Sequence, residues 1–190
     1  MLPGLFKAEY LFRPGQLLRG RRRDIQSDDF VTARLPWGKS IRVSTRDNIG
    51  PQLIRIGVYD LIVTETVWRL CDLGDVAVDV GANVGCMTAA MAHRVGAVGE
   101  VHSFEPHPQL FHELVSNIAS LKQQGEPGAF HPRPQALGAV AGRLPLKIPR
   151  DFAAHRGESS LVDRNDASEA AIEVDVKRRT RYSLRQRRSE

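Results

Sequence analysis

The sequence predicts an α/β protein built on a parallel, doubly wound sheet, and three observations support this prediction. A β-branched run, Asp75–Val80, has the composition of a buried strand and breaks at a glycine-containing turn. A helical pattern follows it, and Glu100–Phe104 is predicted to be a second strand. Pro108 then begins a second helix with a continuous apolar face. Strands and helices that alternate in this way form right-handed βαβ units, so we expect an α/β domain over residues 75–176.

A separate region is predicted ahead of that domain, over residues 30–74. Phe30–Leu35 and Ser40–Ser44 are β-rich runs joined by a Pro-Trp-Gly-Lys turn, which predicts a hairpin. The apolar spacing over Ile54–Leu70 predicts one helix. Residues 1–29 mix prolines, glycines and arginines without a period, so we expect a weakly structured lead-in there.

The remaining elements of the α/β domain are less regular. The first helix is predicted to bury one face, formed by Val84, Met87, Met91 and Val95. Three further runs predict short strands: Phe130–Leu137, Leu144–Ile148 and Ala171–Val176. Two prolines within the first of these runs weaken its prediction, because proline donates no hydrogen bond to a sheet.

The basic charge of the chain belongs to its C-terminal tail. The net charge is +5, with 42% apolar and 26% charged residues, an ordinary globular composition. Residues 176–190 hold seven basic side chains and one acid, whereas the remainder is close to neutral. We therefore expect residues 177–190 to be a disordered basic tail, and we do not expect nucleic acid as a partner.

Several other classes of protein are disfavoured. Two cysteines, Cys71 and Cys86, are too few for a disulfide framework. They do not have the spacing of a zinc site, and the six histidines show no spacing typical of metal ligands. No metal is therefore predicted. The longest apolar stretch is interrupted by Asp79 and Asn83, which argues against a membrane span. No export signal is visible, so a cytoplasmic location is expected.

The loop after the first strand of the α/β domain is predicted to bind a nucleoside. Gly81 lets the chain turn tightly and leaves space for a ligand against the backbone, and Gly85 allows close helix-to-strand packing. Glu105 ends the neighbouring strand, where an ionised carboxylate can accept hydrogen bonds from two ribose hydroxyls. Asn83 is a candidate both for ligand contact and for the helix N-cap.

The same loop favours S-adenosylmethionine over a dinucleotide. A dinucleotide site has the pattern GxGxxG, and this loop lacks the middle glycine. The acid two residues before Gly81, Asp79, is unfavourable for a phosphate and favourable for an ammonium group. An NAD-dependent oxidoreductase is therefore the weaker alternative.

The strings VDVGANVG and FEPHPQLF resemble the FkbM-type family of S-adenosylmethionine-dependent methyltransferases. Tyr59-Asp60 and Ser159-Ser160-Leu161 are also similar to that family. The resemblance implies a class I, Rossmann-like methyltransferase fold and methyl transfer, often to oxygen. It further implies a cofactor site made of seven residues. The methionine end would be lined by Asp79, Gly81, Asn83 and Gly85. The ribose would be held by Glu105, and the adenine would be bordered by Pro106 and His107.

The chain departs from that family after Val176. The family continues with a strand close to Lys-Ile-Asp-Val-Glu-Gly, whereas this chain continues into a run of arginines. We therefore expect a partial methyltransferase domain that is incomplete at its C-terminus, truncated or frame-shifted, and inactive or nearly so. No catalytic base is identified, and the acceptor could be a small molecule, glycan, lipid or peptide. A non-catalytic nucleoside-binding remnant is the alternative.

Overall fold

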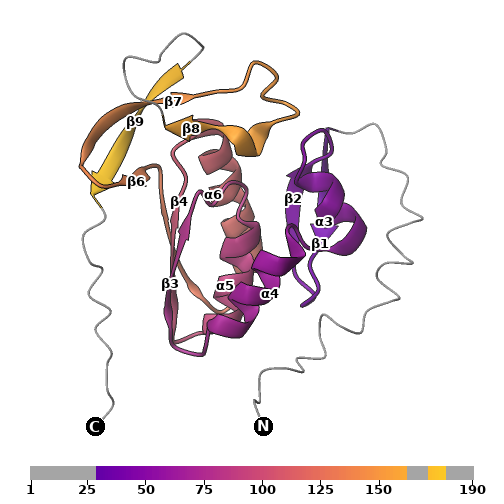
Figure 1. The fold of residues 1–190 in the computed structure, drawn as a ribbon. Helices are drawn as coiled ribbons and strands as arrows, with labels where there is room; N and C mark the ends of the chain where they lie inside the picture. Colours follow the sequence, from indigo (N-terminus) through magenta and orange to yellow (C-terminus); the bar gives the residue numbers. More distant parts are fainter. Residues whose placement is uncertain (1–28, 162–170, 179–190) are drawn as a thin grey trace, which may run out of the picture.

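A parallel three-stranded sheet forms the centre of the protein. The structure is a computed structural model that describes residues 29–161 and 171–178. Three strands, β3 (Val76–Val80), β4 (Glu100–Phe104) and β5 (Ala129–Arg133), pair in the order β3-β4-β5 (Figure 1). The parallel sheet predicted from the alternation of strands and helices is therefore confirmed.

Two helices pack on one face of this sheet. They are α5 (Cys86–Val95) and α6 (Pro108–Gln123), and both lie on the same side of the strands in Figure 1. Side chains of all three strands are buried on this face. The buried residues of α5 are small, mainly alanines, whereas Met87 and Met91 are only half-buried. The predicted methionine face is therefore wrong in part, because small side chains are what allow the helix to approach the strands.

The N-terminal hairpin has the predicted form and is hydrogen-bonded to α6. Strands β1 (Phe30–Arg34) and β2 (Ser40–Ser44) pair antiparallel. The side chain of Asn117, on α6, accepts a hydrogen bond from the backbone N–H of Arg42 at 2.8 Å and donates one to the backbone carbonyl of Arg42 at 2.9 Å. It also donates to the carbonyl of Val84 at 2.8 Å, so one buried amide joins the hairpin to the start of α5.

Two helices occupy the region where the sequence predicted one. Helix α3 (Gly50–Ile56) ends at Gly57, which has a left-handed backbone with φ 80°. Helix α4 (Leu61–Leu70) begins after Asp60, whose carboxylate accepts a hydrogen bond from the N–H of Val63. The apolar period continues across this break, which is why a periodicity argument merges the two helices.

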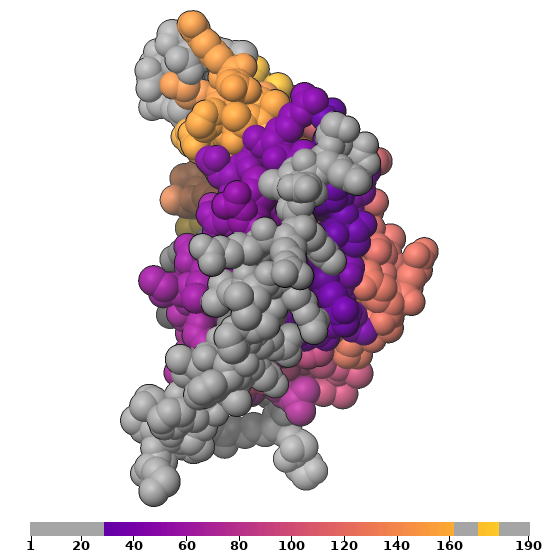
Figure 2. Space-filling view, turned by 90° about the vertical axis from the view of Figure 1, so that its right-hand side faces the viewer, coloured from indigo at the N-terminus to yellow at the C-terminus, as the bar shows by residue number. Residues whose placement is uncertain are grey.

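A second sheet contains the later strands. Its four strands follow the order β6-β9-β7-β8: β6 (Ala136–Gly138), β9 (Ala171–Arg178), β7 (Gly142–Lys147) and β8 (Ser160–Leu161). A 3-10 turn, Arg156–Glu158, precedes β8. The strand predicted over Phe130–Leu137 is thus two strands in two sheets, separated at Pro134 and Gln135. Figure 2 shows part of this sheet, in orange, above the indigo hairpin.

The outer edge of β3 pairs with no strand among residues 29–161 and 171–178. The run Ala171–Val176, predicted to be a strand, lies within β9 and pairs with β6 and β7 and not with β3. Val80 of β3 is 60% exposed. The strand order, the glycine loop after β3 and the helices on one face are those of a Rossmann-like α/β fold. No described helix has the length and apolar character needed to cross a membrane.

Candidate functional site

The glycine loop runs from the end of β3 across the end of β4. The backbone N–H groups of Gly81 and Ala82 both donate to the carbonyl of Phe104, at 2.9 and 3.0 Å. Gly81 has φ 77°, and a Cβ built on it would meet no atom within 4 Å. This glycine is therefore needed for its left-handed backbone, and the space beside it is open.

Glu105 joins this loop to the next helix. Its carboxylate accepts one hydrogen bond from the N–H of Asn83 and another from the N–H of His107, both at 2.8 Å. The side chain is buried, and burial raises the pKa of Glu105 despite these two hydrogen bonds. Each oxygen retains a second lone pair, so the carboxylate can still accept from a ligand.

Gly85 and Asn83 act differently from what the sequence predicted. Gly85 has φ 92°, and a Cβ there would lie 2.8 Å from Leu114 Cδ1, so its close neighbour is helix α6 and not a strand. Gly85 is also the N-cap of α5. Asn83, with φ 50°, uses its Oδ1 to accept from the N–H of Val84 at 2.8 Å. The N-cap alternative for Asn83 is therefore wrong.

Asp79 begins a buried polar chain between β3, α5 and β4. Its Oδ2 accepts from the Thr88 hydroxyl at 2.6 Å, and that hydroxyl lies 2.9 Å from Ser103 Oγ. Burial raises the pKa of Asp79, while hydrogen bonds from Thr88 partly offset the shift. Burial likewise raises the pKa of the Cys86 thiol to about 12, so Cys86 stays protonated at neutral pH and is a poor nucleophile.

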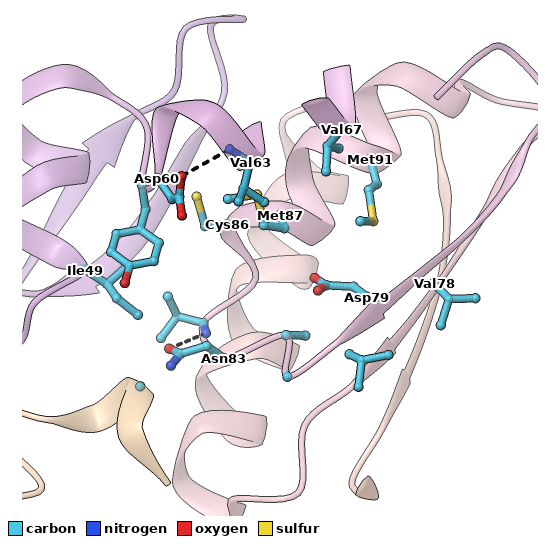
Figure 3. Close-up of a pocket in the computed structure, with 16 residues that line it drawn as sticks. Ile49, Asp60, Val63, Val67, Val78, Asp79, Asn83, Cys86, Met87 and Met91 are labelled. Carbon is cyan, nitrogen blue, oxygen red and sulfur yellow. Dashed lines mark hydrogen bonds between the residues drawn. The ribbon is translucent and has the colours of Figure 1, made fainter. Parts of the chain in front are cut away.

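A cavity of about 450 Å³ lies between the glycine loop, β3 and helices α4 and α5. Figure 3 shows Asp79 facing this cavity, with Met87 and Met91 of α5 beside it. Asp79, Gly81 and Asn83 are the residues of the predicted site that line it. Further lining comes from Ile49, Tyr59, Asp60, Val63, Val67 and Gly157. The volume falls within the usual range for small-molecule sites.

The other predicted site residues lie outside the lining of this cavity. Gly85, Glu105, Pro106 and His107 do not line it. The His107 ring is buried and stacks on Phe152, with centroids 4.3 Å apart. Burial, followed by the charge of Arg156, lowers the pKa of His107. His107 is therefore a buried residue at the start of α6.

Sequence reasoning missed several residues of the cavity. Met87 and Met91 had been assigned to the core, and nothing in the sequence placed Ile49 or Gly157 near the loop. Phe152 lies in the connection between β7 and β8, and its position beside His107 depends on how this connection meets the start of α6. Among these missed residues, only Tyr59 and Asp60 could have been found from the sequence, because Tyr59-Asp60 is part of the family resemblance.

The chain matches no family model and no curated protein. Among solved structures it is similar to a protein assigned as an rRNA methylase from Clostridium thermocellum, with 19% identity and a TM-score of 0.35 over 40% of this chain. It is similar to a protein assigned as a transferase from Pyrococcus horikoshii, with 14% identity and a TM-score of 0.39 over 68% of this chain. A third is a SAM-dependent O-methyltransferase from Thermotoga maritima, with 12% identity and a TM-score of 0.36 over 80% of this chain.

The chain spans different shares of these three proteins. It covers 39% of the Clostridium protein, 50% of the Pyrococcus protein and 94% of the Thermotoga protein.

Proposed function

We propose that the chain binds S-adenosylmethionine and belongs to a methyltransferase of the FkbM type that methylates a hydroxyl oxygen. The observation that carries this proposal is the hydrogen bond from the Asn83 N–H to Glu105. It joins the glycine loop after β3 to the acid at the end of β4. A parallel sheet binds its ligands at this end of its strands.

The charges around the loop favour a cationic ligand. Asp79 and Asp60 line the cavity, and the carboxylate of Glu105 accepts a hydrogen bond from the N–H of Asn83 in the loop. S-adenosylmethionine carries an ammonium and a sulfonium, whereas a dinucleotide brings a pyrophosphate that these carboxylates would repel. Asn83 occupies the position where a dinucleotide-binding loop has its middle glycine.

The chain's residues fit the cofactor in three respects. The open space beside Gly81 lets a ligand approach the backbone. The cavity extends from there to Tyr59 and Asp60, which suits the amino-acid end of the cofactor. Outside the cavity lining, Glu105 has spare lone pairs for ribose hydroxyls, and Pro106 and His107 follow it for the adenine.

The cofactor supplies an electrophilic methyl group on sulfur, and the protein's task is to align it with an acceptor and to exclude water. We assign no general base. We expect the acceptor to be a small molecule, glycan, lipid or peptide, and the family resemblance implies a hydroxyl oxygen as the atom that receives the methyl group.

Calorimetric titration of the full chain with S-adenosylmethionine, its demethylated product and NAD tests this proposal. We expect the two sulfur nucleosides to bind and NAD to bind more weakly. Glu105→Ala should cost about 1–3 kcal/mol of binding free energy, because hydrogen bonds to a charged acceptor are lost. Glu158→Ala, at an exposed acid on the 3-10 turn, is the control. Tighter binding of NAD, or equal affinity of Glu105→Ala and the parent, would contradict the proposal.

Methyl transfer is tested separately from binding. Cell extract and cofactor with a labelled methyl group would be incubated with the chain. Labelled product that disappears in Glu105→Ala supports a methyltransferase. Cofactor binding without transfer would support the alternative, a nucleoside-binding protein without catalysis.

A further inference from the structure

Three potential metal ligands lie together on the face of the parallel sheet opposite α5 and α6. His102 of β4 and His131 of β5 are direct partners in the strand register. Glu100 lies two residues before His102 on the same strand. Because side chains alternate along a strand and paired residues of neighbouring strands point the same way, all three project from one face.

The distances within this cluster match the edges of a metal coordination shell. Glu100 Oε2 lies 3.2 Å from His102 Nε2 and 3.5 Å from His131 Nε2, and the three ligand atoms lie within 4.8 Å of one another. With metal–ligand bonds of about 2.0–2.1 Å, two ligands of a tetrahedral zinc ion are roughly 3.3 Å apart. The two imidazole rings stack with centroids 4.6 Å apart, so both rings are already aligned.

Exposure and charge allow an ion to enter. The His102 side chain is 12% exposed, whereas those of Glu100 and His131 are 50% and 42% exposed. The cluster therefore has a partly buried base and an open outer side where water could complete the shell. The positive charge of Arg133 acts on His102 and opposes a cation, and Glu100 supplies the compensating negative charge.

We propose that Glu100, His102 and His131 form a site for a divalent transition metal ion, with Zn²⁺ as the probe. The site would have three protein ligands and one position open to water, a set of two imidazoles and one carboxylate that suits zinc. It lies on the face of the sheet opposite the helices that flank the glycine loop, so it is separate from the proposed cofactor site. By joining β4 to β5, a bound ion would stabilise the folded sheet.

The test is calorimetric titration of the metal-free full chain with Zn²⁺, beside absorption spectra of the Co²⁺ form. We expect one ion per chain and Co²⁺ spectra without a thiolate charge-transfer band. His131→Asn and Glu100→Gln should each weaken binding about 100-fold or more, because each removes a direct metal ligand. Even the loss of a residue that only contacts a ligand costs about 10–100-fold in metal affinity. Zn²⁺ should also raise the melting temperature of the parent and not that of His131→Asn.

The matched control is His155→Asn. His155 also contacts a glutamate, with Nδ1 2.9 Å from Glu158 Oε1, but no described third ligand completes that pair. Its substitution should leave Zn²⁺ affinity unchanged. Circular dichroism of every variant would confirm that it is folded. Equal affinity of folded His131→Asn and the parent, a thiolate band, or no binding by the parent would show that Glu100 only accepts hydrogen bonds from the two histidines.

Discussion

The two faces of the parallel sheet differ in what they contact. On the face toward α5 and α6, Val101 is completely buried and Phe130 is 7% exposed. On the opposite face, Val80 is 60% exposed and Glu100 is exposed. The residues of both faces come from the same three strands. The opposite face is not uniformly exposed, because Phe104, the register partner of Val80, is completely buried. Exposure there is largest on β3, the edge strand of this sheet.

The covered face also contains polar groups, and these lead to the glycine loop. Asp79, Thr88 and Ser103 form a hydrogen-bonded chain within an otherwise apolar layer. The opposite face has its own polar cluster, at Glu100, His102 and His131. The first cluster is enclosed and the second is open, so substitutions at the two should have different effects on folding.

The largest difference is expected between Phe130→Ala and Val80→Ala. Removal of the Phe130 ring leaves a cavity beneath the helices and should lower the free energy of unfolding by about 3–5 kcal/mol. Val80→Ala removes a mostly exposed side chain and should change it by no more than about 0.5 kcal/mol. Urea unfolding of both variants measures this. Similar losses would mean that both faces are covered in solution.

Gly85→Ala should be the next most damaging change, and Gly81→Ala is its control. Both positions have left-handed backbones, which cost a residue with a side chain about 1–2 kcal/mol. Only at Gly85 would the new Cβ also collide with Leu114, which adds about 1–3 kcal/mol. Thermal unfolding should therefore rank Gly85→Ala below Gly81→Ala. The reverse order would contradict the assignment of Gly85 as the crowded position of the loop.

Thr88→Val tests the enclosed polar chain. It removes the hydroxyl that bridges Asp79 and Ser103, so buried acceptors lose a donor at a cost of about 1–3 kcal/mol. Thr88→Ser retains the hydroxyl and should lose less. Chemical denaturation of the two variants compares them, and an equal loss in both would indicate that the methyl group and not the hydroxyl matters.

Asp79→Asn should have the smallest effect, visible mainly as a change in pH dependence. The pKa of Asp79 is raised in the folded state, so its stabilising contribution is present below the ordinary value of 3.8 and is lost as pH rises through the folded pKa. Above that range the parent should be less stable relative to Asp79→Asn than it is at low pH. Unfolding measured across pH tests this, and parallel curves would show that the carboxyl is not perturbed.

The elements that flank the loop were predictable because each carries a local signal. The β-branched run before Gly81, the strand before Glu105 and Pro108 at a helix start fixed their positions to within a residue or two. The break at Gly57 was missed because apolar spacing continues across it, and the division at Pro134 was missed because both parts are β-rich. The disordered tail was predicted to begin at Lys177, which is wrong for Lys177 and Arg178 because both belong to β9. The remainder of the predicted tail, residues 179–190, lies outside the described residues.

From the sequence, only those residues of the candidate site that lie next to the end of a single strand could be predicted. Asp79, Gly81 and Glu105 lie next to strand ends, where sequence position alone suggests a site. The contact of Gly85 with Leu114, the stacking of His107 on Phe152 and the pairing of His102 with His131 depend on how separate elements meet. Sequence spacing contains no information on such contacts.

The most direct test of the proposed site is nuclear magnetic resonance of the labelled chain titrated with the demethylated cofactor. We predict that the backbone amide signals of Gly81, Asn83 and His107 shift together with one affinity. The first lies beside the open space of the loop, and the other two donate to Glu105. The same titration of Glu105→Ala should produce smaller shifts at equal ligand concentration. Shifts confined to the second sheet, with these three amides unchanged, would contradict a cofactor site at the glycine loop.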